Sequence, residues 1–281
     1  MNIFCTEEEE FDMRVIEFQP LDHKEAQVTG YLRTIIKEQQ NRKKCYPAIV
    51  ICPGGGYEMV SEREAEPVAY EYMAAGYHVF ILRYSIRPKA GDFRPLMELA
   101  NTVEKIRKNA REWKVDPDCI AVCGFSAGGH LAASLGTLAH NEAFIKAYGK
   151  NHGFYPNAMV LSYPVITADE YAHIGSIENA SGNKKGTEEY KFFGLDHHVT
   201  KDTCPVFLWH TSEDDCVPVE NSLAMARALS KEKIPYELHV FPHGGHGMSV
   251  CTEEVGVKSP YNQRWMKWSI EWLNQLFGYQ K

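Results

Sequence analysis

One short segment of the sequence has the residues and the surroundings of a catalytic nucleophile. The segment Gly124–Gly128 reads Gly-Phe-Ser-Ala-Gly and matches the pattern G-x-S-x-G. A short apolar run of β type precedes it, and a small-residue helix pattern follows it. Between a strand and a helix, small neighbours allow a serine to occupy a sharp, strained turn with its hydroxyl above the sheet edge. We therefore predict that Ser126 is a nucleophile, with an ordinary tight turn as the alternative.

A serine hydroxyl becomes a good nucleophile only when a base takes its proton and a buried carboxylate orients that base. The preferred base is His246, which lies in a glycine-rich stretch directly after the last expected strand; His243 in the same stretch is the alternative. The carboxylate is expected from the run Glu213-Asp214-Asp215, which follows another expected strand. Spacing alone does not choose among these acids. The order serine, acid, histidine along the chain differs from the two protease orders built on other folds.

A second glycine-rich segment could supply hydrogen-bond donors for this chemistry. Residues 53–57 read Pro-Gly-Gly-Gly-Tyr and follow the apolar run Tyr46–Cys52. Consecutive glycines allow backbone N–H groups to point into a site where a tetrahedral oxyanion develops. We predict an oxyanion hole made by N–H groups of Gly55, Gly56 and Ala127. A phosphate-binding loop is the alternative, but the sequence lacks its Gly-Lys-Ser/Thr ending and its G-x-G-x-x-G spacing here.

The elements that must position these residues alternate between strands and helices. We expect strands at 11–18, 27–36, 46–52, 77–84, 119–123, 158–163, 205–210 and 237–241. We expect helices after Ser126 and at 62–75, 95–113, 219–231 and 261–277, with Asp116-Pro-Asp118 as a turn. Such alternation predicts an α/β fold with a mostly parallel sheet and helices on both faces.

The motifs span residues 53–247, so one sheet must gather them, and we expect a single domain over residues 1–281. Residues 1–45 are expected to contribute early strands. Between about 164 and 204 the periodicity fades, which indicates a small cap or insertion rather than a second core.

Composition and charge exclude several classes of protein. The 281 residues are 44% hydrophobic and 24% charged, the balance of an ordinary globular protein. A net charge of −7 without a long basic run argues against a nucleic-acid partner. Residues 119–141 carry no charged side chain and could cross a bilayer, but their glycines and strand-turn-helix pattern favour a buried segment and no membrane partner. Because the N-terminus has no secretory signal, we expect a cytoplasmic protein whose eight cysteines are reduced.

Taken together, these motifs resemble those of bacterial α/β-hydrolase-fold serine esterases. The segments that carry the resemblance are 53–57, 116–118, 124–130, 208–218 and 241–247. They are similar to the acetyl-xylan-esterase-like carbohydrate esterases, often labelled sugar hydrolases and related to the catalytic domain of prolyl oligopeptidases. The resemblance covers about residues 46–277 and implies the α/β-hydrolase fold with a small cap.

The resemblance also selects the acid. In that family a His-x-x-x-Asp-x-x-x-Pro pattern marks the orienting carboxylate, which is Asp214 here, with Asp215 as the fallback. The implied triad is therefore Ser126, Asp214 and His246. One departure concerns the oxyanion loop, because Pro53 stands where many esterases of the hormone-sensitive-lipase type have histidine.

The resemblance implies a serine carboxylesterase for small acyl esters, with acetyl groups on sugars or xylo-oligosaccharides as expected substrates and no metal or organic cofactor. We expect Tyr57 and Phe125 to line the substrate pocket, with core packing as the alternative. A metal role for His197-His198 or His243 is a minor alternative. A prolyl-oligopeptidase-like aminopeptidase, an arylformamidase and an inactive hydrolase-fold binding protein are the alternative functions. The sequence also allows a homodimer.

Overall fold

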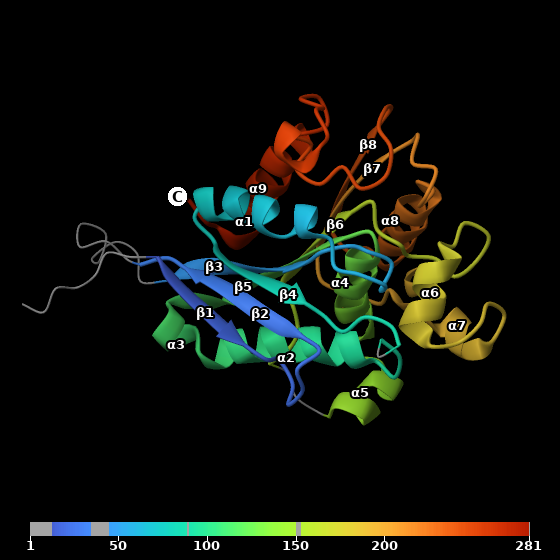
Figure 1. Cartoon of the computed structure of the whole chain (residues 1–281), viewed down its shortest axis with the longest axis horizontal. Helices are drawn as coiled ribbons and strands as arrows, with labels where there is room; N and C mark the ends of the chain where they lie inside the picture. Colours follow the sequence, from blue (N-terminus) through green and yellow to red (C-terminus); the bar gives the residue numbers. More distant parts are fainter. Residues whose placement is uncertain (1–12, 35–44, 89, 150–152, 281) are drawn as a thin grey trace, which may run out of the picture.

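The computed structural model describes residues 13–34, 45–88, 90–149 and 153–280. Its centre is an eight-stranded sheet in the order β1-β2-β4-β3-β5-β6-β7-β8 (Figure 1). The strands are β1 (Arg14–Phe18), β2 (Gln27–Leu32), β3 (Tyr46–Cys52), β4 (His78–Arg83), β5 (Val115–Phe125), β6 (Ala158–Ser162), β7 (Val206–Thr211) and β8 (Tyr236–Phe241). The β1–β2 and β2–β4 pairs are antiparallel, and every pair from β4 through β8 is parallel. The expected mostly parallel sheet is therefore confirmed.

Helices cover both faces of the sheet, as expected (Figure 1). The principal ones are α1 (Glu66–Ala74), α2 (Arg94–Lys108), α4 (Ala127–Leu138), α8 (Glu220–Glu232) and α9 (Arg264–Phe277). Successive side chains of a strand point to opposite faces. In β3, Ile49 and Ile51 pack into the apolar cluster of α1 and α9, whereas Ala48 and Val50 pack into the cluster of α2, α4 and α8. All seven β3 residues are buried, which explains its continuous apolar sequence.

Three local predictions need correction. The helix expected at 95–113 is divided at Asn109 into α2 and the short α3 (Ala110–Trp113), because the Asn109 amide turns back to the Lys105 carbonyl. The Asp116-Pro-Asp118 turn lies within β5 as a bulge. Tyr46 of β3 pairs with Val115 of β5, but Ala48, two residues later, pairs with Ile120. The helix expected at 62–75 begins as a 3₁₀ turn, η2 (Glu62–Glu64), before α1. The short helix α5 (Glu142–Tyr148) was not predicted.

The segment between β6 and β7 contains α6 (Ile174–Ser181), α7 (Glu188–Phe192) and the 3₁₀ helix η3 (Leu195–His198). Val165, Ala168, Ile177 and Tyr190 of this segment form a small apolar cluster with Val217, while Ile166 and Leu195 of the same segment join the main core. Figure 1 shows α6 and α7 together at one end of the sheet, beside α8. We call residues 164–204 the cap. In the part of the chain that the structure describes, no helix is long and apolar enough to span a membrane.

Candidate active site

Ser126 lies at the sharp turn between β5 and α4. Its backbone has φ 54° and ψ −118°, a conformation that is unfavourable for a residue with a side chain. The turn is held on both sides: the Ser126 N–H donates to the Ser162 carbonyl at 3.0 Å, and the Ser126 carbonyl accepts from the His130 N–H at 3.0 Å. A Cβ on Gly124 or Gly128 would collide with backbone carbonyl groups. The glycines of G-x-S-x-G are thus required by the close passage of the backbone around Ser126.

The structure brings Ser126, His246 and Asp214 into one chain of hydrogen bonds. The Ser126 Oγ lies 2.8 Å from Nε2 of His246, and Nδ1 of His246 lies 2.7 Å from Oδ2 of Asp214. A carboxylate only accepts, so Nδ1 carries a proton, and in the neutral form of the ring Nε2 has a lone pair that faces the serine hydroxyl. This is the tautomer in which a histidine can remove a proton from serine.

Asp214 is buried and surrounded by donors. Its Oδ1 accepts from the N–H groups of Cys216 at 3.1 Å and Val217 at 2.9 Å, and its Oδ2 lies 3.3 Å from Nε2 of His210. Burial opposes ionisation of the carboxyl, but the hydrogen bonds from His210 and His246 prevail and hold the pKa of Asp214 well below its ordinary value. Asp214 is therefore a carboxylate throughout the neutral range.

His210 contacts Asp214 and is itself held by two further hydrogen bonds. Its Nε2 lies 2.8 Å from the Val217 carbonyl and its Nδ1 lies 2.8 Å from the Ser222 hydroxyl. Because a carbonyl only accepts, the proton is on Nε2, where it is shared between Val217 and Asp214.

The alternative acids and base lie elsewhere. Glu213 is exposed and pairs with His243, whose Nδ1 lies 2.9 Å from a Glu213 carboxylate oxygen. Asp215 is exposed as well. The structure therefore places one acid, Asp214, and one histidine, His246, beside Ser126, and it separates the other candidates from the serine.

The glycine-rich loop after β3 lies directly against Ser126, because β3 and β5 are neighbours in the sheet. A Cβ on Gly54 would be only 3.0 Å from the Ser126 Cβ. Gly55 and Gly56 have φ of 125° and 67°, which glycine adopts without strain. Ala127 is the first residue of α4, so its N–H has no acceptor within the helix. The loop that carries Gly55 and Gly56 therefore lies next to the start of α4, at Ser126 and Ala127.

Tyr57 and Phe125, expected in the substrate pocket, are instead packed in the interior. Tyr57 is 2% exposed and its hydroxyl lies 2.9 Å from Nδ1 of His130, while Phe125 is fully buried and its ring contacts those of Tyr163 and Trp265. Neither side chain presents a surface to a bound molecule, so we do not include them in a substrate site.

The cap contributes residues that the sequence did not indicate. Nδ1 of His173 lies 2.8 Å from the Ser176 hydroxyl, and the Asn179 amide donates to the Gly56 carbonyl at 2.8 Å. Burial lowers the pKa of His173, the nearby His246 lowers it further, and Asp214 opposes the shift. Helix α6 thus borders the glycine loop. Its sequence has no periodicity or motif that could have revealed this.

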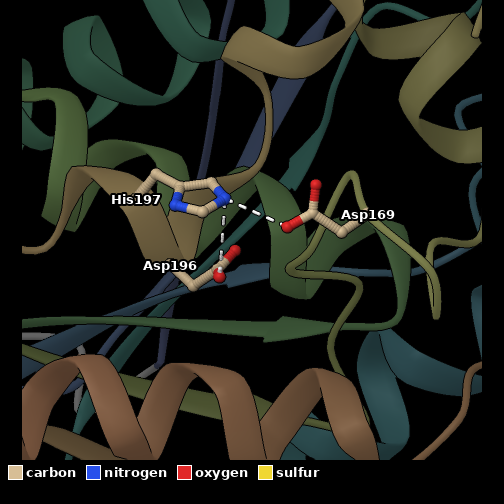
Figure 2. Close-up of side chains that lie close together, drawn as sticks. All are labelled: Asp169, Asp196 and His197. Atoms are coloured by element: carbon tan, nitrogen blue, oxygen red, sulfur yellow. Dashed lines mark hydrogen bonds and ion pairs between the residues drawn. The ribbon is translucent and has the colours of Figure 1, made fainter. Parts of the chain in front are cut away.

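One surface cluster has the donor types of a metal site. Figure 2 shows Asp169, Asp196 and His197 of the cap with ligand atoms within 4.8 Å of one another. Nε2 of His197 is 3.1 Å from Asp169 Oδ2 and 3.9 Å from Asp196 Oδ2. Asp169 and His197 are exposed, and His198 faces the Phe192 carbonyl at 2.7 Å instead of joining its neighbour. The arrangement is that of a surface ion pair, and we assign no metal to it.

Residues 35–229 match the model of the family described as BD-FAE. The chain belongs to the BD-FAE family. This confirms the resemblance to α/β-hydrolase esterases. The chain is 34% identical over 233 residues to "Endo-1,4-beta-xylanase B" of Butyrivibrio fibrisolvens, which covers 80% of this chain and 36% of that protein. It is 28% identical over 244 residues to the acetylxylan esterase of Xylanibacter ruminicola, which covers 83% of this chain and 45% of that protein.

The fold of this BD-FAE chain is also found among solved structures. It superposes on the acetyl ester-xyloside bifunctional hydrolase of Caldicellulosiruptor lactoaceticus with a TM-score of 0.81 and 30% identity, over 96% of this chain and 98% of that one. The chain therefore spans less than half of the two curated relatives but nearly the whole of this solved structure. Two of these three relatives, the acetylxylan esterase and the acetyl ester-xyloside bifunctional hydrolase, have names that refer to esters.

Proposed function

We propose that this BD-FAE chain is a serine carboxylesterase. The observation that carries the proposal is the hydrogen-bonded chain from Asp214 through His246 to a serine held at positive φ at the start of a helix. An inactive hydrolase-fold binding protein has no need of this strained serine or of a buried carboxylate fixing the histidine tautomer.

In the proposed mechanism Ser126 Oγ attacks the ester carbonyl carbon while Nε2 of His246 takes the hydroxyl proton. The resulting imidazolium is stabilised by Asp214, and the carbonyl oxygen becomes an oxyanion that accepts from the N–H of Ala127 and from N–H groups of the Gly55–Gly56 segment. Collapse of the tetrahedral intermediate breaks the bond to the alcohol oxygen, which leaves with the proton from Nε2. Water then attacks the acyl-enzyme by the same route and releases the carboxylic acid.

We further propose acetyl esters of sugars or xylo-oligosaccharides as substrates. Two observations support this class: the relatives include a protein named acetylxylan esterase and one named acetyl ester-xyloside bifunctional hydrolase, and the cap places the polar side chains of His173, Ser176 and Asn179 beside the glycine loop. Hydroxyl, imidazole and amide groups suit a substrate that carries hydroxyls. The proposed reaction needs only ester and water.

A substrate panel tests this function. Acetylated xylo-oligosaccharides, p-nitrophenyl acetate, amino-acyl naphthylamides and N-formylkynurenine would be compared at equal enzyme concentration, each with the Ser126→Ala variant as control. We expect turnover of the two acetyl esters and its loss in the variant. Preferred cleavage of the naphthylamides would support an aminopeptidase instead, and preferred cleavage of N-formylkynurenine an arylformamidase. Equal ester turnover by Ser126→Ala would refute the proposed nucleophile.

A further inference from the structure

Glu64 is a buried carboxyl group directly behind Ser126. Its residue is 3% exposed and belongs to the 3₁₀ turn η2, which follows the glycine loop. A Cβ placed on Gly54 would lie 2.7 Å from Glu64 Oε2 and 3.0 Å from the Ser126 Cβ. Only a glycine backbone therefore separates the carboxyl group from the serine.

The two oxygens of Glu64 bind two different loops of the site. Oε2 accepts from the Gly54 N–H at 2.8 Å, and Oε1 accepts from the Tyr163 hydroxyl at 2.7 Å. The Tyr163 oxygen in turn accepts from the Ser249 N–H at 2.8 Å. Ser249 follows His246 by three residues. One carboxyl group thus joins the glycine loop, the loop after β6 and the histidine loop.

The hydrogen bonds indicate that this carboxyl group is ionised. The Gly54 N–H can only donate, and the Tyr163 hydroxyl, whose oxygen already accepts from Ser249, directs its own proton at Glu64. Burial raises the pKa of Glu64 above its ordinary value, and the bonds to Tyr163 and Gly54 and the nearby His246 and Arg63 offset only part of that rise. The titratable groups that face it are Arg63, Tyr84, Cys123, Tyr163 and His246.

A buried carboxylate without a close basic partner costs free energy. Among the described residues, no Lys or Arg side chain forms an ion pair with Glu64. The one nearby group that gains a positive charge during the proposed reaction is His246, whose ring lies 5.1 Å from the Tyr163 ring. The charge of Glu64 is therefore placed where an imidazolium would form.

We propose that Glu64 is a positioning residue of the esterase: its carboxylate fixes the glycine loop and the histidine loop relative to Ser126, and its charge favours the imidazolium form of His246. This inference rests on the proposed function. By engaging the Gly54 N–H, Glu64 leaves the following peptide groups, Gly55 and Gly56, directed to the oxyanion. Through Tyr163 and Ser249 it holds the segment that carries the histidine.

The test compares Glu64→Gln with Tyr163→Phe in the full chain, using p-nitrophenyl acetate. Glutamine keeps the size of the side chain but removes the charge. It also replaces one carboxylate oxygen with an NH₂ group, which cannot accept the hydrogen bond donated at that position. We expect kcat to fall about 10- to 100-fold with little change in KM, because small misplacements of catalytic groups have effects of this size. We also expect the acid limb of the kcat–pH profile to move to lower pH, because the imidazolium loses a stabilising charge.

In Tyr163→Phe we expect a lower kcat with the acid limb at the same pH as in the wild type, since the carboxylate remains.

Glu98→Gln is the matched control. Glu98 is also fully buried and also accepts from a backbone N–H, that of Ser85 at 2.8 Å, and from the Ser85 hydroxyl, but it lies outside the site. We expect this variant to lose stability and to retain the wild-type kcat and pH profile.

A wild-type kcat in Glu64→Gln, or a reduced kcat with an unmoved acid limb, would overturn the proposal. If Glu64→Gln does not fold, Tyr163→Phe decides, and a wild-type kcat in that variant overturns it equally. Failure of the esterase proposal and failure of the Glu64 proposal give different results. Absence of ester turnover in the wild-type protein refutes both proposals. An active wild type with an equally active Glu64→Gln refutes the role of Glu64 alone.

Discussion

The molecule contains two aspartate–histidine pairs of similar length in very different surroundings. In the active site, Asp214 Oδ2 lies 2.7 Å from His246 Nδ1, and their side chains are 0% and 19% exposed. In the cap, Asp169 Oδ2 lies 3.1 Å from His197 Nε2, and the corresponding values are 66% and 61% (Figure 2). A hydrogen bond between aspartate and histidine is therefore not sufficient for catalysis. Burial, a fixed tautomer and a serine on the free ring nitrogen are what the first pair has and the second lacks.

The comparison also explains the direction of the pKa shift in the active site. Asp214 loses hydration on burial but gains donors from His210, His246 and the Val217 N–H, so its pKa falls. The cap pair remains in contact with water, where an ion pair contributes little. A carboxylate that is both buried and saturated with donors can hold a histidine in one orientation.

The largest expected effect comes from removing the histidine of each pair. His246→Ala should lower kcat for p-nitrophenyl acetate by about 10⁶-fold, because the serine loses its base. His197→Ala should leave kcat unchanged. Equal activity of the two variants, or a larger loss in His197→Ala, would contradict the distinction between the two pairs.

The second effect concerns the acids. Asp214→Asn should lower kcat by about 10⁴-fold, because an amide in that place no longer selects the tautomer with Nδ1 protonated. Asp215→Asn and Asp169→Asn serve as matched controls on exposed aspartates and should retain kcat. Steady-state kinetics on the three purified variants measures kcat. A larger loss of kcat in Asp215→Asn than in Asp214→Asn would show that Asp215 is the residue that orients His246.

A third effect separates buried from exposed histidines through stability. Burial lowers the pKa of His78 and of His130 to about 4. In the unfolded chain the value is about 6.5, so between these limits the unfolded state binds more protons and stability falls as pH decreases. The stabilisation is complete above pH 6.5, and its loss by pH 4 amounts to roughly 3 kcal/mol for each histidine.

Urea unfolding at pH 7 and at pH 4.5 measures this effect. His130→Asn should show a smaller decrease between the two pH values than the wild type, whereas His197→Ala should show the wild-type decrease. An unchanged decrease in His130→Asn would mean that this histidine is not held neutral in the folded state.

The smallest expected effect is that of chelation. If Asp169, Asp196 and His197 form only a surface ion pair, extensive dialysis against EDTA should leave ester turnover and the thermal unfolding midpoint unchanged. A loss of either, restored by Zn²⁺ or Mn²⁺ in the wild type but not in His197→Ala, would turn the cluster into a metal site and contradict our assignment.

The parts that could be predicted from the sequence are those with local causes. The strand at Tyr46–Cys52 is buried on both faces and so reads as a continuous apolar run, and the turn at Ser126 requires small neighbours that are visible as glycines. The mostly parallel sheet could be predicted because its strands alternate with helices along the chain. The motifs also indicated Ser126 and His246, whereas the choice of Asp214 among three adjacent acids came from the family resemblance.

The parts that could not be predicted depend on contacts between distant residues. Glu64 is one of three glutamates in a charged stretch typical of a solvated helix start. Its burial is explained by its partners Gly54 and Tyr163, and Tyr163 is 99 residues away. Asn179 contacts Gly56 across 123 residues. Tyr57 and Phe125 were expected to face substrate because their motifs are adjacent to the site, but adjacency in sequence does not determine on which side of the sheet edge a ring packs.

The central claim is that the oxygen of Ser126, activated by the buried pair, becomes acylated. The most direct test is to mix the protein with p-nitrophenyl acetate, quench with acid within the first turnovers, and locate the added group by peptide mass spectrometry. We predict one acetyl group on the peptide that contains Ser126 in the wild-type protein and none on that peptide in Ser126→Ala or His246→Ala. Acetylation confined to another residue, with turnover retained in Ser126→Ala, would contradict the claim.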